Sequence, residues 1–435
     1  MNTKLFNEEL FSFLKSVPTP YHAVSALEDE LIHHQFIKLD EGTPWNIEQG
    51  KRYYCIRNGA LVALATGSNT DLLKGFRMIG AHTDSPSLQI KPKSKSDCAP
   101  YLVCGVEKYG GAILSSWFDR ELSLAGRVSF TRTDGSHKTV LIDFSRPILY
   151  IPSLAIHLNR AVNEGQELNP QTHLSPILAQ SFTDQIPDLE SIIADQLVTQ
   201  YPDERPEKIN GFDLFCYDAS KPGIFGVNSE FIAAPRLDNL LSCFVGLKSI
   251  IQSKDQTNVL LICSNHEEIG SRSNSGALGN FMLSFLSRLF HSNQEKFISQ
   301  HNSFLVSLDN AHASHPNYQE SYDKDHRVLL NQGPVMKINA NQRYSTTGLT
   351  ASVLRVLAAE ADIACQDFVM KSDMPCGSTI GPLTSAQIGI AAVDIGIPTL
   401  GMHSIREITG SNDPFELYRL ACQFVNRKTL PSFHD

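Results

Sequence analysis

Several features that would assign a chain to a particular class are missing from this sequence. No run approaches the roughly 18 apolar residues that a membrane-spanning helix needs, and the best runs, such as Val259–Ile262, have the length of a strand. Positive charge is not in excess either, since 46 acidic residues outnumber 37 basic residues and the formal net charge is -9. We therefore expect neither a membrane nor a nucleic acid as a partner.

Cysteine pairs and a secretory leader are missing as well. The nine cysteines are an odd number without a Cys-x-x-Cys motif, which fits neither a disulfide framework nor a thiolate zinc finger. The first ten residues include Lys4, Glu8 and Glu9, where a secretory signal has a continuous apolar core. We expect a protein of the reducing cytoplasm.

Short apolar runs alternate with helical patterns along most of the 435 residues. Tyr53–Ile56, Leu61–Ala65 and Met78–Ala81 are bounded by glycine or polar residues, as the strands of a buried sheet are. Thr19–Pro20 predicts a helix start, because threonine caps helices and proline suits the first turn. Apolar residues at a three-to-four spacing follow Asp238 and predict another helix. This alternation predicts an α/β core.

The pattern changes between about residues 93 and 227. Strand-like runs stand here at Arg127–Phe130 and Val140–Phe144. We interpret residues 93–227 as a second domain inserted into the first. The first domain would then consist of residues 1–92 and 228–435.

Four of the predicted strands run into acidic or histidine side chains. This is the edge at which an open α/β sheet binds its ligands. The side chains that follow these strands are His82 with Asp84, Glu267 with Glu268, Asp309, and His403. These side chains have plainer explanations when each is viewed alone: a core histidine, a turn cap at Asp84, or a solvated loop at the two glutamates. Asp238, which precedes a predicted helix, could likewise be a plain N-cap.

Together, these residue types are what a two-metal hydrolase needs. Zinc binds imidazole nitrogen and carboxylate oxygen. Two zinc ions need one bridging carboxylate and two further protein ligands each. A glutamate as general base and a carboxylate that orients a ligating histidine complete such a site. Glu267 or Glu268 and Asp84 are available for these last two tasks.

Longer strings along nearly the whole chain point to a family. They are Ser16–His22, His82–Pro86, Ser153–Leu158, Pro235–Asn239, His266–Gly270, Asp309–Ala313, His315–Tyr318, Gly333–Lys337, Asp373–Pro382 and Met402–Glu407. In these strings the sequence resembles the aspartyl aminopeptidases, which are metallopeptidases with two co-catalytic zinc ions. The resemblance implies a mixed-sheet α/β zinc-peptidase core with helices on both faces, interrupted by a smaller β-rich domain. It also implies that residues 1–92 and 228–435 form the catalytic domain and that residues 93–227 serve dimerisation and assembly. Self-association, typically as a dodecamer, is implied as well.

Position by position, the resemblance implies a set of metal ligands. Asp238 would bridge two Zn²⁺ ions per subunit, with Co²⁺ or Mn²⁺ as substitutes. His82 and Asp309 would hold one ion, and Glu268 and His403 would hold the other.

The resemblance also implies the roles of the remaining site residues. Glu267 would be the general base, and Asp84 would orient His82. Lys337 would supply the cation that an acidic substrate side chain needs, although a lone lysine on a strand is more often solvated. The other predicted substrate-binding residues are His312, Gly377, Ser378 and His157, which would reach a neighbouring subunit.

The sequence thus predicts a zinc-dependent aminopeptidase that hydrolyses the first peptide bond of peptides, with a preference for N-terminal Asp or Glu. Three alternatives stay open: a broad-specificity or neutral-preferring aminopeptidase, a zinc deacylase, and a non-catalytic peptide-binding oligomer. An acidic protein can accept an acidic substrate, because the metals and Lys337, and not the net charge, would determine the local field.

Overall fold

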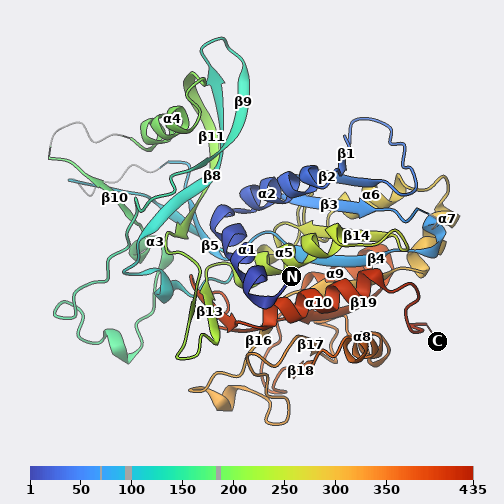
Figure 1. Cartoon of the computed structure of the whole chain (residues 1–435). Coiled ribbons are helices and arrows are strands. Elements are labelled where there is room, and N and C mark those ends of the chain that lie inside the picture. Colours follow the sequence, from blue (N-terminus) through green and yellow to red (C-terminus); the bar gives the residue numbers. More distant parts are fainter. Residues whose placement is uncertain (69–70, 94–99, 183–187, 435) are drawn as a thin grey trace. The chain divides into compact units, whose positions relative to one another are not determined.

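The structure, a computed structural model, describes residues 1–68, 71–93, 100–182 and 188–434, and it divides the chain into two compact units (Figure 1). The first unit consists of Met1–Ser85, Pro222–Met402 and Glu407–Asp435. The second consists of Pro86–Lys221 and His403–Arg406. Both borders of the second unit's main segment lie a few residues before the predicted domain edges at 93 and 227.

A nine-stranded mixed sheet forms the centre of the first unit. Its order is β1 (Ile37–Lys38), β2 (Arg52–Arg57), β3 (Ala60–Ala65), β14 (Val259–Ser264), β4 (Arg77–His82), β15 (Phe304–Leu308), β19 (Ala391–Gly396), β17 (Val335–Ile338) and β18 (Gln366–Val369). The strands β14, β4, β15 and β19 are parallel, whereas β3 and β17 join them antiparallel. The carboxyl ends of the four central strands therefore lie at one edge, with Ser264 opposite His82.

Helices cover both faces of this sheet, which explains why β3, β4 and β14 are buried along their whole length. Ile79 of β4 packs into the core beneath one helical layer, and Met78 packs into the core on the other face. The first layer contains α1 (Thr3–Ser16), α2 (Pro20–His33), α5 (Leu237–Ile251), α8 (Gly348–Glu360) and α10 (Asp413–Asn426), and the second contains α6 (Phe281–Ser287) and the end of α9 (Ile380–Ile388). The predicted α/β fold is confirmed.

A smaller sheet of the first unit leads into the candidate site. Its order is β12 (Gly223–Phe225), β13 (Phe231–Ala234), β21 (Glu407–Gly410), β20 (Pro398–Leu400) and β16 (Ala311–His312). Ala234 at the end of β13 pairs with Glu407 at the start of β21. Because α5 begins only three residues after β13, this sheet determines where α5 starts.

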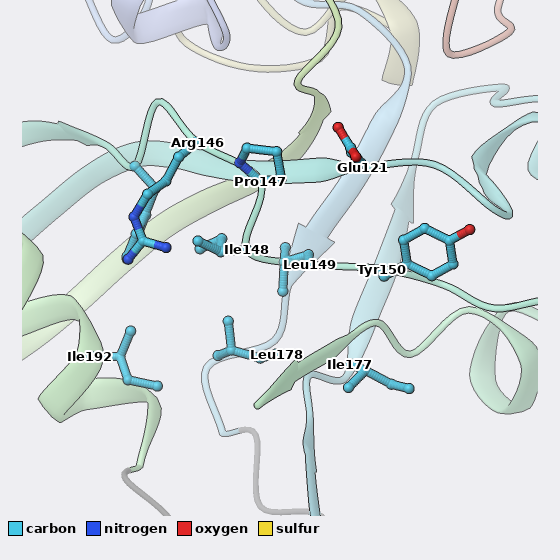
Figure 2. A pocket seen from close by; sticks show the side chains of 10 residues that line it. Glu121, Arg146, Pro147, Ile148, Leu149, Tyr150, Ile177, Leu178 and Ile192 are labelled. Carbon is cyan, nitrogen blue, oxygen red and sulfur yellow. The ribbon is translucent and has the colours of Figure 1, made fainter. Parts of the chain in front are cut away.

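The second unit is mainly antiparallel β structure. Its five-stranded sheet has the order β7 (Val106–Tyr109), β5 (Ser87–Ile90), β11 (Pro206–Asp218), β8 (Leu122–Arg132) and β9 (His137–Asp143), and a separate pair joins β10 (Ile177–Gln180) to β6 (Tyr101–Val103). The helices are α3 (Pro170–His173) and α4 (Leu189–Gln200). A hollow of about 490 Å³ lies in this unit. Figure 2 shows Ile148, Leu149, Leu178 and Ile192 among its mainly aliphatic walls.

Short elements and thiols complete the description. The remaining helix of the first unit is α7 (Asn293–His301), and the 3₁₀ turns are η1 (Leu72–Lys74), η2 (Leu114–Trp117), η3 (Val162–Glu164), η4 (Glu267–Ile269) and η5 (Gln319–Ser321). The eight cysteines among the described residues are free thiols, and Cys98 lies outside the described residues. In the part of the chain that is described, no helix combines the length and the apolar character needed to cross a membrane.

Candidate metal centre

His82 ends the buried strand β4 and is only 1% exposed. Its Nδ1 lies 3.0 Å from the main-chain oxygen of Asp84 and 3.5 Å from Asp84 Oδ1. Its Nε2 lies 3.5 Å from Asp238 Oδ1 and 4.0 Å from Glu267 Oε2. One ring nitrogen is thus held by the residues that follow the strand, and the other is directed toward carboxylates.

Asp84 joins two distant segments of the chain at this edge of the sheet. Its Oδ1 accepts the main-chain N–H of Glu267 at 3.0 Å, and its Oδ2 accepts that of Glu268 at 3.1 Å. Asp84 therefore does more than cap a local turn. Because both oxygens are used, the carboxylate fixes η4 beside His82.

Asp238 lies in the first turn of α5, where its backbone departs from helical dihedral angles. Its N–H donates to Glu407 Oε2 at 2.9 Å, and its carbonyl accepts from Ser85 Oγ at 2.6 Å. The next residue, Asn239, donates from Nδ2 to the carbonyl of Leu308 at 2.8 Å, and the peptide bond between the two is cis. Asp238 therefore does not precede the helix as a plain N-cap would.

Three of the predicted ligands meet closely. His82, Asp238 and Glu268 each offer one ligand atom, and these atoms lie within 4.8 Å of one another. One imidazole and two carboxylates are donors that zinc accepts. The residues at this edge thus fit a zinc ion by their chemistry as well as by their spacing.

Lys337 and Asp309 form a buried pair next to this group. Asp309 follows β15, and its Oδ2 lies 3.6 Å from Lys337 Nζ on β17. The ammonium also donates to the carbonyl of Asn310 at 3.0 Å and lies 5.1 Å from the ring centroid of Tyr344. Lys337 is only 3% exposed, so the explanation of a solvated lysine is wrong.

The crowding of acids changes how these groups bind protons. Burial raises the pKa of Glu267 to about 7, and the carboxylates of Asp309, Asp84 and Asp238 add to the increase against the opposing effect of His82. Burial also raises the pKa of Asp309, although Lys337 opposes it. Burial would lower the pKa of His82, but Asp238 and Asp84 outweigh it and hold that pKa well above the usual range. Because its negative charges repel one another, such a cluster of carboxylates is stabilised by bound protons or cations.

Two predicted site residues belong to the second unit. His403 is at the start of its His403–Arg406 segment, and a Cβ at Gly111 would lie 3.1 Å from its Nδ1. His157 is exposed in a segment without regular structure, among the exposed apolar side chains Ile156 and Leu158. The ligand role of His403 and the substrate role of His157 stay predictions.

The other predicted substrate residues lie in the first unit. His312 ends β16, with its ring centroid 5.6 Å from that of Phe368 in an edge-on contact. Gly377 and Ser378 lie in an exposed loop before α9. A Cβ at Gly377 would meet no atom within 4 Å, so local crowding does not demand glycine there. Their substrate roles also stay predictions.

Sequence reasoning missed the residues that hold Asp238 and His82 by their main chains. Glu407, which is 2% exposed, and Ser85 bind the main chain of Asp238, and Cys243 Sγ lies 3.0 Å from the carbonyl oxygen of His82. Glu407 stands in a string that carries the family resemblance, but nothing in one sequence pairs it with a residue 169 positions earlier.

A comparison with known families decides the identification. Residues 13–425 match the family described as aminopeptidase I zinc metalloprotease (M18). The chain belongs to the M18 family. It is therefore a zinc metallo-aminopeptidase, and the zinc deacylase and the non-catalytic oligomer are excluded.

Curated relatives and solved structures resemble this M18 chain over almost its full length. It is 46% identical to a probable M18 family aminopeptidase 2 of Ectopseudomonas mendocina, over 97% of this chain and 98% of the relative. A probable M18 family aminopeptidase 2 of Azotobacter vinelandii is 45% identical, over 99% and 100%.

Among solved structures, a complex of Ape4 and Nbr1 superimposes with a TM-score of 0.93 at 38% identity, covering 97% of this chain and 86% of the other. The dodecamer of mApe1 from S. cerevisiae gives 0.81 at 28% identity, covering 96% and 95%. An M18 aminopeptidase from Thermotoga maritima gives 0.85 at 22% identity, covering 98% and 96%, and supports the fold alone.

Proposed function

We propose that this M18 aminopeptidase removes N-terminal Asp or Glu from peptides with the help of two zinc ions per subunit. Asp238 would be shared by both ions, with His82 and Asp309 as the further ligands of one and Glu268 and His403 as those of the other. The approach of His82, Asp238 and Glu268 within 4.8 Å supports the centre. Together with Asp84 and Glu267, the three carboxylate ligands make five carboxylates at this centre. Their combined negative charge suits a total positive charge larger than one ion carries.

The chain's own residues would orient the centre and move the proton. When bound, zinc supplies Lewis acidity and a water with a pKa near neutrality. With zinc bound, His82 would be neutral, with Nδ1–H donating to the main-chain oxygen of Asp84 and the lone pair of Nε2 on the side of Asp238. Glu267, 4.0 Å from that Nε2, takes the proton of the attacking water and passes it to the departing amine.

The buried ammonium of Lys337 is the observation that carries the acidic preference. A carboxylate side chain in a confined pocket needs a cation, and Lys337 lies beside the predicted ligand Asp309. If Asp309 binds a metal, its negative charge is compensated there, and Lys337 becomes free to bind a substrate carboxylate. The pair of Lys337 with Asp309 also supports the alternative of a broad or neutral preference, in which the lysine serves only to hold that aspartate.

Replacing Lys337 separates the two possibilities. We expect K337M to lower kcat/KM for an N-terminal Asp substrate by roughly tenfold to a hundredfold, the effect of a hydrogen bond between charged groups. An otherwise identical Leu substrate should be affected less than threefold. The matched control K324M removes an exposed lysine and should change neither value. A parallel loss on both substrates, or faster cleavage of Leu than of Asp by the unchanged protein, would refute the acidic preference.

Metal counting tests the two-ion centre. We expect two zinc ions per subunit by mass spectrometry of the loaded protein, and one in the variant H403A. The control H291A changes an exposed histidine outside the centre and should keep both ions. One ion per subunit in the unchanged protein would refute the proposal.

Self-association is also proposed, with the second unit as the assembly domain. The exposed apolar side chains around His157 and the dodecamer described for mApe1 support this proposal. His157 would then contribute to the site of a neighbouring subunit, and His312, Gly377 and Ser378 would line the substrate path of their own subunit. The free thiols of the described cysteines support a reducing compartment such as the cytoplasm.

A further inference from the structure

A second hollow, of about 510 Å³, lies in the first unit at the end of β4 opposite to His82. It is bounded by Arg77, the first residue of β4, by residues 255–258 before β14, and by Lys428 and Thr429 after α10. The main-chain N–H of Arg77 donates to the carbonyl of Asn258 at 2.8 Å, which ties the beginnings of both strands together. Its volume falls in the range of small-molecule sites, roughly 300–1,000 Å³.

Arg77 is buried in this hollow without an anion. The residue is 9% exposed, and its Nε has no hydrogen-bond partner among the described residues. A terminal guanidinium nitrogen of Arg77 donates to the carbonyl of Lys428, at 3.3 Å. Burial alone lowers its pKa, to about 10, because no carboxylate of the described residues compensates the charge. A buried charge of this kind is unfavourable unless a partner of opposite charge binds it.

Further positive charge surrounds the same hollow. Lys74 and Lys428 line it with exposed side chains, and Asp255 is the one acidic residue among the residues that line it. Three cations against one carboxylate make the hollow positive in a chain whose net charge is -9. A planar guanidinium offers parallel N–H donors to a phosphate, and lysines add point charges.

We propose that this hollow binds a phosphate group, either as free inorganic phosphate or as part of a small phosphomonoester. Arg77 donates from its guanidinium group to a phosphate oxygen, and Lys74 and Lys428 neutralise the outer oxygens. The site uses no residue of the metal centre, so the two can be tested independently.

Calorimetric titration of the zinc-loaded protein tests the proposal. The two probes are inorganic phosphate and a nucleoside monophosphate, each measured against sodium chloride of equal ionic strength. We expect one binding event per subunit and a rise in the unfolding temperature with at least one probe. Tighter binding of the monophosphate assigns the hollow to organic phosphates, and tighter binding of inorganic phosphate assigns it to the free anion. If neither probe binds, the proposal is wrong.

Variants locate the binding event. R77M should weaken phosphate binding by roughly tenfold to a hundredfold. In phosphate-free buffer it should unfold at no lower temperature than the unchanged protein, because it removes an uncompensated buried charge. If R77M does not fold, the double variant K74Q/K428Q carries the test and should also weaken binding at least tenfold. The control K4Q/K15Q removes two exposed lysines elsewhere in the unit and should bind within twofold. Unchanged binding in both R77M and K74Q/K428Q would overturn the assignment.

Discussion

Replacing Asp84 with asparagine tests the structural centre of the site most directly. Asp84 is fully buried and accepts the N–H groups of Glu267 and Glu268 at 3.0 and 3.1 Å. Asparagine has the same shape but can accept only one of these bonds, and its NH₂ group then faces the other N–H. One charged hydrogen bond is lost and the second becomes neutral. With roughly 1.5–3 kcal/mol for a bond to a charged group and about 1 kcal/mol for a neutral one, we expect a loss of about 2–5 kcal/mol.

The metal state should change this value in a defined direction. Without a cation, removing one negative charge relieves repulsion from Glu267 and Asp238, so the loss falls toward the lower end of the range. With zinc bound, D84N also replaces the carboxylate that lies 3.5 Å from His82 Nδ1 and helps to orient the ring, and a residue of this kind typically contributes tenfold to a hundredfold in metal affinity. The difference between the loaded and stripped proteins should therefore be about 1.4–2.8 kcal/mol.

Urea unfolding of both forms and competition for zinc with a chromophoric chelator measure these quantities. The matched control is D40N, because Asp40 is exposed and its carboxylate accepts one N–H bond, from Gly42 at 2.8 Å. We expect D40N to lose less than about 1 kcal/mol and to bind zinc normally. If D84N and D40N unfold alike and bind zinc alike, Asp84 does not organise the centre and the reasoning is wrong.

Two further predictions concern stability away from the metals. Burial raises the pKa of Asp413 to about 6, against 3.8 for the ordinary group. A carboxyl group whose pKa is raised in the fold adds to the free energy of unfolding below about pH 4, and this contribution is lost as the pH rises through 6. Urea unfolding at a series of pH values should therefore show the free energy of unfolding fall by about 3 kcal/mol over this window. D413N should remove this pH dependence of the free energy of unfolding, and D40N should keep it. An equal pH dependence in the unchanged protein and in D413N would contradict the assignment. In the second unit, a Cβ at Gly126 would lie 1.9 Å from the carbonyl oxygen of Asp213, whereas Gly211 has no atom within 4 Å of that position. G126A should therefore destabilise this unit by about 3 kcal/mol or more in thermal unfolding and G211A by less than about 1 kcal/mol, and similar losses would show that β8 and β11 can separate to admit the methyl group.

The sequence predicts the central strands well because their patterns are local. The run Met78–Ala81 falls within β4, and the apolar residues after Asp238 form α5. Thr19 caps α2 and accepts the N–H of His22, as its position before Pro20 predicts. Burial on both sides of a parallel strand produces a continuous apolar run, which is visible without any knowledge of its neighbours.

The contacts that hold the site together could not be predicted in the same way. Asp84 binds main-chain groups 183 and 184 residues away, and Glu407 binds the N–H of a residue 169 positions earlier. Such bonds depend on strand order, and a sequence pattern does not state that β4 lies between β14 and β15. Lys337 was expected from the family resemblance, but its burial beside Asp309 follows from β17 pairing with the edge of β19.

The strand β4 connects the two ends of this charge distribution. It begins at Arg77, where cations surround a hollow, and ends five residues later at His82, where carboxylates gather. At about 3.3 Å per residue the two side chains are separated by roughly 16 Å, and the buried residues between them exclude the water that would screen a charge. The net charge of -9 therefore averages over two local fields of opposite sign. One end of the strand attracts metal cations and the other attracts anions, so zinc and phosphate should each stabilise the fold from its own edge of the same sheet.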